Sequence, residues 1–290
     1  MEARALIPPS VQAPGQPAPR LRAPNLLAPR VLAPKLLAIV FPAALLALWS
    51  AATWNHPDGL IPQPSQVVQE IVDFAGFAGH NDGFSGTLWP NLLASASRVY
   101  GGFLISAALA LPLGLLIGRL ALVRRMLDST LQILRPVPVT AWQPLFLILF
   151  GLGSSSAVLL VALGCFYPIL LNTILGVRSV EPRLFEAAAK LGVSRTAVFP
   201  KVVLPSALPG IFTGLRLGLG LGWVVIVVGE MSGIRTGLGA MIVDAREVSR
   251  TDVVIAGMIA IGLAGFISDQ AMQMLSRRLL RWSPQHSGRG

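Results

Sequence analysis

Long runs of apolar residues alternate with short polar segments along most of the chain. A helix needs about 20 predominantly apolar residues to cross the hydrocarbon core of a membrane. Six runs are long enough, with approximate ranges 36–54, 98–118, 127–150, 157–176, 209–230 and 253–275. The pattern therefore predicts an all-α integral membrane protein with six transmembrane helices.

Two segments are expected to differ from straight spans. The third run contains the sequence RPVP at 135–138. Because proline removes a backbone donor and restricts the residue before it, this run predicts a bent or two-part helix. Between the first two runs, apolar residues at 67, 68, 71, 72, 74 and 75 have the spacing of a one-sided helix. We expect this short helix to lie along the outer membrane surface or to pack against the bundle.

The two ends of the chain differ from the region of apolar runs. Residues 1–35 are rich in proline and alanine, with a loose repeat of LRAP, LLAP and VLAP. Proline at this density disfavours both helix and sheet, so a disordered or extended tail is predicted. The tail lacks the layout of a cleavable signal peptide. The predicted organisation is a tail over 1–35, a transmembrane domain over 36–282 and a C-terminal tail over 283–290.

The amino-acid composition is also typical of a protein embedded in a membrane. The chain has 290 residues, of which 53% are hydrophobic and only 12% charged, and its mean hydropathy is +0.68. A soluble domain carries roughly 25% charged residues. The net charge of +10 could suggest nucleic acid as a partner. However, the basic residues form short clusters between apolar runs rather than a stripe interleaved with aromatics, so lipid and not nucleic acid is the expected partner.

The basic clusters also predict an orientation. Seventeen of the 23 Lys and Arg residues fall in the N-terminal tail, in the segments around 119–125 and 178–201, and after the last apolar run, from residue 277 to the C-terminus. Only Arg235, Arg246 and Arg250 fall in the segments that would lie on the opposite side. Because cytoplasmic loops carry the excess of Lys and Arg, both termini and the 178–201 segment are predicted to be cytoplasmic. For a bacterial chain this means a multi-pass protein of the inner membrane.

The sequence lacks the motifs of several kinds of chemistry. Its only lysines, Lys35, Lys190 and Lys201, do not stand in a phosphate-binding Gly-x-x-x-x-Gly-Lys-Ser/Thr motif, and no nucleophile elbow or His-Glu-x-x-His is present. Cys165 is the single cysteine, and the three histidines are far apart. We therefore expect no catalytic residue, no metal site and no cofactor in this chain. Any energy for uphill transport would have to come from a partner.

One polar segment between apolar runs, EAAAKLGVSRTAVFPKVVLP at 186–205, has the pattern of a folded unit. Pro182 fits the first turn of a short helix, and the alanine-rich sequence after it propagates the helix. Gly192 is expected to end this helix, and Ser194 to cap a second short helix. A rigid helix–turn–helix that protrudes into the cytoplasm would fit a groove on another protein.

The same segment resembles the EAA signature of binding-protein-dependent ABC importer permeases. The signature is matched by Glu186, Ala187, Ala188, Gly192, Phe199 and Pro205. Beyond the segment, LIPQPSQVV, SASRVYGGF, LRPVPVTAWQPLFLILFGLG and RTDVVIAGMIAIG are similar to the nitrate/sulfonate/taurine subgroup. The likeness covers nearly the whole chain after about residue 36 and leaves out the proline-rich tail. Pro200, directly after Phe199, departs from the pattern and puts the second short helix in question.

The resemblance implies a type I ABC importer permease with a cytoplasmic coupling-helix loop. In that family the loop sits in a cleft of a separate ATPase subunit, which binds ATP and Mg. The implied partners are a second copy of the chain, two ATPase subunits and an extracytoplasmic solute-binding protein. The implied solute is a small sulfonate, taurine or a nitrate-like anion, moved by alternating access. The resemblance alone does not rank these solutes.

Residues inside the spans provide further candidates. The residues that could line the transport pathway are Gln143, Tyr167, Asn172 and Trp223, and each could instead serve packing or an interhelical hydrogen bond. Gly214, Gly218 and Gly222 have the spacing that lets two helices approach closely, either between two copies of the chain or within one.

Two other classes of protein remain as alternatives. A stand-alone secondary transporter would show inverted repeats and ionisable sites within the membrane. An integral-membrane enzyme would show clustered titratable residues at one face. The sequence shows neither pattern clearly.

Overall fold

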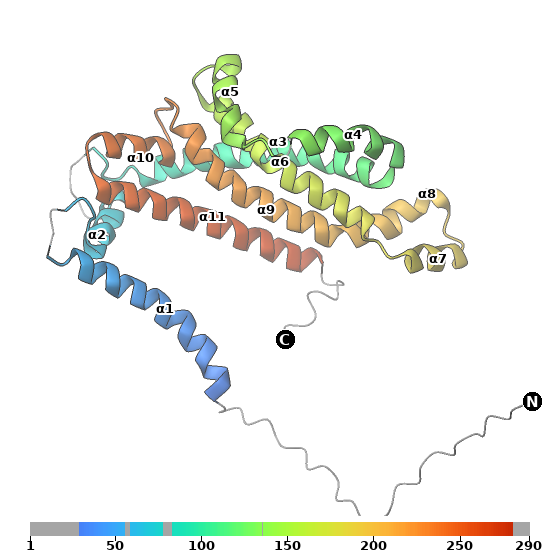
Figure 1. Cartoon of the computed structure of the whole chain (residues 1–290), viewed down its shortest axis with the longest axis horizontal. Coiled ribbons are helices and arrows are strands. Elements are labelled where there is room, and N and C mark those ends of the chain that lie inside the picture. Colours follow the sequence, from blue (N-terminus) through green and yellow to red (C-terminus); the bar gives the residue numbers. More distant parts are fainter. Residues whose placement is uncertain (1–28, 56–58, 78–82, 135, 281–290) are drawn as a thin grey trace, which may run out of the picture. The chain divides into compact units, whose positions relative to one another are not determined.

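The computed structural model describes residues 29–55, 59–77, 83–134 and 136–280. The predicted C-terminal tail and the first 28 residues of the predicted N-terminal tail lie outside these ranges. Within them, all regular secondary structure is helical, in agreement with the predicted fold class (Figure 1). The chain forms two compact units, Met1–Ala52 and Thr53–Gly290.

The first unit contains nearly all of α1, Pro29–Thr53. This helix begins seven residues before the predicted span, so residues 29–35 are helical and not extended. Pro29 occupies the first turn, where its missing N–H would have no helical partner. Within its own unit, α1 leaves its large apolar side chains from Ile39 to Leu48 uncovered.

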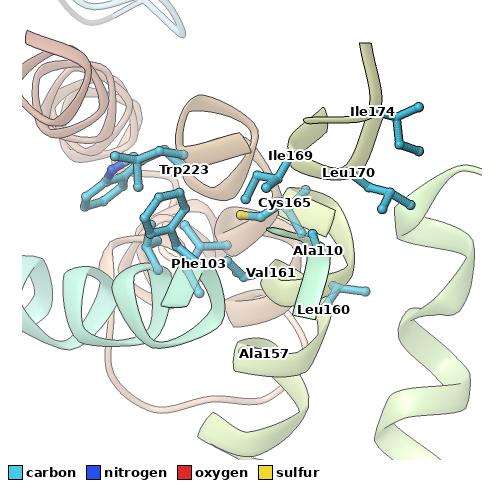
Figure 2. Close-up of a cluster of buried hydrophobic side chains, with 14 of the residues drawn as sticks. Phe103, Ala110, Ala157, Leu160, Val161, Cys165, Ile169, Leu170, Ile174 and Trp223 are labelled. Carbon is cyan, nitrogen blue, oxygen red and sulfur yellow. The ribbon is translucent and has the colours of Figure 1, made fainter. Parts of the chain in front are cut away.

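Three long helices form the core of the second unit: α3 (Leu88–Arg119), α6 (Ser154–Arg178) and α9 (Leu204–Glu230). They lie side by side, and α6 contacts both of the others (Figure 1). Figure 2 shows the buried side chains between them, with Phe103 from α3, Cys165 and Ile169 from α6, and Trp223 from α9. Cys165 is fully buried, and its thiol donates to the Gly218 carbonyl of α9 at 3.1 Å.

Small residues let α6 approach both neighbours closely. On α3 a buried row recurs at every fourth residue, with Gly102, Ser106, Ala110 and Gly114, and the partly buried Gly118 continues it at the end of the helix. A Cβ on Gly114 would lie 2.7 Å from Thr173 of α6, where there is no room for it. On α9 the glycines at 210, 214, 218 and 222 face the other side of α6; a Cβ on Gly214 would lie 2.8 Å from Asn172 Cβ. The close approach is thus made within one chain.

The remaining helices complete the second unit. Helix α11 (Thr251–Leu279) contacts α9, and α10 (Leu238–Glu247) packs where α9, α11 and α3 meet. The predicted one-sided helix is α2 (Pro64–Phe74), which packs against α11. Its buried face includes Val67 and Phe74, and Glu70 on the same face receives a hydrogen bond from Arg250 at 2.9 Å.

The third apolar run is divided in two. Helix α4 (Ala121–Leu134) ends before the prolines, and the short 3₁₀ helix η1 (Val139–Trp142) leads into α5 (Gln143–Phe150). The two halves meet at an angle of 87°. Among the described residues, α3, α6, α11 and the helix from Thr196 to Glu230 are long and apolar enough to cross a membrane, and the bent pair would make a fifth span. The apolar stretch Ile39–Thr53 of α1 is shorter, so six spans remain a prediction.

Candidate functional site

The segment between α6 and α9 begins with a helix that is fixed at both ends. Helix α7 (Pro182–Lys190) follows Glu181 as N-cap, with Pro182 in its first turn as the sequence predicts. At its C-terminus the Gly192 N–H donates to the Ala189 carbonyl at 3.1 Å, and the Val193 N–H donates to the Ala188 carbonyl at 3.0 Å. This pair of bonds is a Schellman motif.

Gly192 has a φ of +71°, as that motif requires. The glycine is exposed, and a Cβ built on it would meet nothing within 4 Å. Backbone conformation rather than space therefore explains a glycine at this position.

The second half of the segment differs from the predicted short helix. Helix α8 (Arg195–Val198) continues through a π-helical turn, η2 (Phe199–Val203), directly into α9. Pro200 and Pro205 both lack an N–H, so the regular α-helical bonding cannot pass through them. The Leu204 N–H instead donates to the Phe199 carbonyl, five residues back. A π turn accommodates the prolines, and α9 extends into the loop without a break.

Ser194 is the N-cap residue of α8, but its side chain does not cap the helix as predicted. The hydroxyl lies 3.3 Å from Thr196 Oγ1, and the serine carbonyl accepts from the Ala197 and Val198 N–H groups. The helix therefore begins at the predicted residue through backbone bonds alone.

Helix α7 leaves most of its surface uncovered. Glu186 and Ala187 are exposed, and Ala188 is the one buried residue of the helix. The apolar side chains of Leu184, Phe185 and Leu191 are exposed as well, Leu191 by 81%. A groove of about 540 Å³ runs between α7 and the start of α9 and is lined mainly by apolar residues, among them Leu184, Ala187, Ala188, Leu191, Val193 and Pro205. Exposed apolar surface of this kind on a loop is typical of a protein-binding site.

Phe199 ties this segment to the end of α3. The Arg119 guanidinium lies over the Phe199 ring, 4.7 Å from its centroid. Phe199 also packs against a buried apolar cluster that includes Val177 of α6 and Ala207 of α9. Of the six signature residues, Ala187, Ala188 and Pro205 line the groove, Gly192 shapes the turn and Phe199 anchors it. Glu186 stands exposed beside them.

The four predicted pathway residues do not form one cluster. Gln143 donates to the Val228 carbonyl at 2.8 Å, and Asn172 donates to Pro168 of its own helix at 2.8 Å. The Trp223 indole is buried and donates to Ser268 Oγ at 2.9 Å. Tyr167 packs edge-on against the neighbouring Phe166. Each has a separate neighbour, so the geometry gives them no common site.

A buried ion pair at the α10 end of the core was not predicted from the sequence. Arg98 of α3 and Glu230 of α9 are 6% and 1% exposed, with Nη1 and Oε1 2.6 Å apart. The Glu230 carboxylate also accepts from Ser95 Oγ and from the Gly239 N–H, both at 2.9 Å. Arg98 donates to the Thr236 carbonyl at 2.6 Å. The network joins α3, α9 and the start of α10.

A second ion pair lies near the middle of the apolar helices. Arg216 of α9 donates through Nε to Asp269 Oδ1 at 2.9 Å and through Nη2 to Oδ2 at 2.8 Å. The two side chains are 35% and 36% exposed. A charged side chain at the centre of a lipid-facing helix costs roughly 3 kcal/mol. Two arginines and two acids inside apolar runs were the signal in the sequence that could have predicted both pairs.

Comparison with known proteins identifies the family. Residues 110–281 match the model for the binding-protein-dependent transport system inner membrane component. The chain belongs to this family. It is thus a permease subunit of an ABC importer, a transport component and not a catalytic one, and its apolar helices make it a multi-pass protein of the inner membrane.

Individual relatives agree with this assignment. The taurine transport system permease protein TauC of Escherichia coli is 39% identical over 242 residues, which are 83% of this chain and 87% of TauC. SsuC of Bacillus subtilis, named provisionally as an aliphatic sulfonates transport permease, is 37% identical over 86% of this chain and 88% of its own. The bicarbonate transport system permease protein CmpB of Synechococcus elongatus is 37% identical over 68% of this chain and 70% of CmpB.

A solved structure shows the fold of the family. A chain of the MetNI methionine ABC transporter, in inward-facing conformations, matches with a TM-score of 0.59 at 18% identity. The match covers 69% of this permease and 99% of that chain. The predicted type I importer permease fold is therefore confirmed.

Proposed function

We propose that this permease moves a small anion into the cytoplasm by alternating access, driven by a separate ATPase that docks on α7. The observation that carries the proposal is the exposed apolar groove between α7 and the start of α9. Its walls are continuous with α9 through the π turn, and α9 is packed closely against α6. A push on α7 is therefore transmitted to two core helices at once.

The proposed assembly contains two copies of this permease, two ATPase subunits and an extracytoplasmic binding protein. ATP and Mg belong to the ATPase. The family description supports a binding protein, and the relatives named for taurine, sulfonate and bicarbonate transport support a small oxyanion or sulfonate as solute. Both termini and α7 face the cytoplasm in this proposal, in keeping with the distribution of Lys and Arg.

The docking step is tested by placing a charge in the groove. Leu191→Asp puts a carboxylate on an apolar side chain that is exposed in the isolated permease, so the permease itself should insert and fold normally. We expect the partner ATPase subunit to co-purify at less than about a tenth of the normal yield, a loss of about 1.4 kcal/mol or more. Val248→Asp, at an exposed valine after α10, is the matched control. Normal ATPase yield with Leu191→Asp would refute docking at this groove.

A further inference from the structure

The Arg216–Asp269 pair lies on a surface that lipid should not cover. Both side chains sit near the middle of long apolar helices, and each is about a third exposed. Charged groups within membrane helices face the bundle interior or a water-filled cavity because hydrocarbon cannot solvate them. This side of α9 and α11 therefore faces water or protein in the working assembly.

Neighbouring residues extend the polar surface. Thr213 is exposed one turn before Arg216 on α9, and Gly220 follows one turn after it, with open space where a Cβ would be. Ser268, the residue before Asp269 in α11, is itself buried, and its hydroxyl lies 2.8 Å from that of Tyr100 of α3. On α9, Thr213 and Gly220 thus continue the same helix face as Arg216.

The chemistry of the pair suits a transported anion. Asp269 occupies Nε and one Nη2 hydrogen of Arg216, and within the described part of the chain the other guanidinium hydrogens have no partner. A planar fork of N–H donors matches the oxygens of a sulfonate or carboxylate. Because Asp269 balances the charge of Arg216, the pair has no net charge, and an anion would be held only by the guanidinium N–H groups that Asp269 does not use. Such weak binding suits a solute that has to leave again.

We propose that Arg216, oriented by Asp269, is a binding site for the transported anion on a water-lined face of α9 and α11. The inference deepens the proposed function, since it names the residue that recognises the solute within the membrane. The path along this face contains Thr213, Arg216 and Gly220 from α9, with Asp269 from α11.

Cysteine labelling tests the site in the purified permease reconstituted in liposomes, without ATPase or binding protein. Cys165 is the only cysteine and is fully buried, so the native background is low. Gly220→Cys places a thiol one turn from Arg216, at a position where an added Cβ meets nothing within 4 Å. The two probes are water-soluble methanethiosulfonates of equal length, one bearing a sulfonate and the other a trimethylammonium group. Both probes react with the same thiolate, so the ratio of their two labelling rates is unaffected by any change in the ionisation of the thiol.

We expect Gly220→Cys to react with both probes and Leu109→Cys, on an apolar exposed face of α3, to react with neither. Adding Arg216→Gln should lower the sulfonate-to-ammonium rate ratio about tenfold, or about 1.4 kcal/mol, because it leaves the Asp269 charge alone. Asp269→Asn should raise the ratio. The double variant Arg216→Gln with Asp269→Asn, which buries no unpaired charge, should return it to an intermediate value.

Protection of the cysteine by a bound solute distinguishes a general effect of charge from specific binding of the sulfonate by the guanidinium group. Methanesulfonate should slow labelling of Gly220→Cys, and Arg216→Lys should abolish this protection while keeping the rate ratio, because lysine retains the charge but not the fork. An unreactive Gly220→Cys, or a rate ratio that is the same in all charge variants, would overturn the proposal. Neither result depends on ATPase docking, so this test and that of the Leu191→Asp variant can fail independently.

Discussion

Arg98 Nη1 and Glu230 Oε1 lie 2.6 Å apart in the interior of the permease, although 132 residues separate them in the chain. Glu230 is also the acceptor for Ser95 and for the Gly239 N–H at the start of α10. The pair therefore connects the end of α9 to α3 and positions the loop that follows.

Removing the Glu230 charge should destabilise the permease strongly. Glu230→Gln leaves the Arg98 guanidinium buried without its counter-charge, which typically costs about 3–5 kcal/mol. The apparent Tm in detergent should fall sharply, whereas Asp244→Asn, at an exposed acid of α10, should leave it unchanged. Adding Arg98→Met to Glu230→Gln should recover part of the loss. An unchanged Tm in Glu230→Gln would mean that the pair contributes little to the fold.

Gly192→Val should uncouple the ATPase. At a φ of +71° a non-glycine residue costs on the order of 1 kcal/mol, and a β-branched residue more, so the Schellman turn should open. Uptake in proteoliposomes should collapse, and the ATPase should co-purify poorly or hydrolyse ATP without responding to solute. Gly86 offers a matched control, since it has a φ of +69° and equal space for a Cβ but lies before α3. If Gly86→Val loses the ATPase to the same extent, the effect is general strain and not coupling.

Glu186→Lys isolates the exposed acid of α7. Within the described chain Glu186 is exposed and has no hydrogen bond or ion pair, so its substitution should leave insertion and Tm near normal. We expect transport to be lost and ATPase co-purification to fall, because the side chain is free to meet the partner. Glu247→Lys on α10 makes the same change of charge at an exposed acid elsewhere. Full ATPase retention with normal uptake in Glu186→Lys would contradict a role in docking.

The glycine row on α9 should be intolerant of side chains where it meets α6. Gly218→Val places a Cβ 2.9 Å from Ile169 and 3.1 Å from the Cys165 carbonyl, so the helices must separate. Overpacking of this kind costs about 1–3 kcal/mol and should lower the Tm in detergent. Gly220→Ala, two residues further on, meets nothing within 4 Å and should be neutral or stabilising by up to about 1 kcal/mol. Equal Tm values for the two variants would argue against this packing.

The predicted topology is tested by reporter fusions. With Lys and Arg concentrated in the tails and the 178–201 segment, a reporter at the C-terminus should be cytoplasmic and one inserted after Gly83 should be outside. Alkaline phosphatase, active only outside, and a fluorescent protein that folds only inside give opposite readings at each point. An external C-terminus would overturn the span assignment.

Local rules predicted much of the candidate site. Pro182 and Gly192 mark the two ends of α7 because first-turn proline and positive φ depend only on neighbouring backbone. The prolines of RPVP likewise mark the end of α4. These features need no information from distant parts of the chain.

Features that depend on contacts with distant parts of the chain were not predicted. The π turn at Phe199–Val203 reflects competition between two prolines and the packing of α9, which a residue pattern does not resolve. The acidic partners of Arg98 and Arg216 come from other helices. Because Arg98 was taken as the end of a span, the predicted span begins ten residues inside α3, which begins at Leu88. From sequence alone, an arginine that is buried in an ion pair looks the same as an arginine at the end of a membrane span, because its acidic partner is not known.

The two rows of small residues on either side of α6 have a mechanical consequence. With backbone and side-chain atoms this close, α3, α6 and α9 have no room to slide past one another, so together they behave as a rigid plate. Motion during a transport cycle then has to occur at the margins of the plate. The joints available there are Leu120 between α3 and α4, the proline segment before η1, and Gly151 with Gly153 between α5 and α6. A force on α7 would therefore turn the plate as a whole.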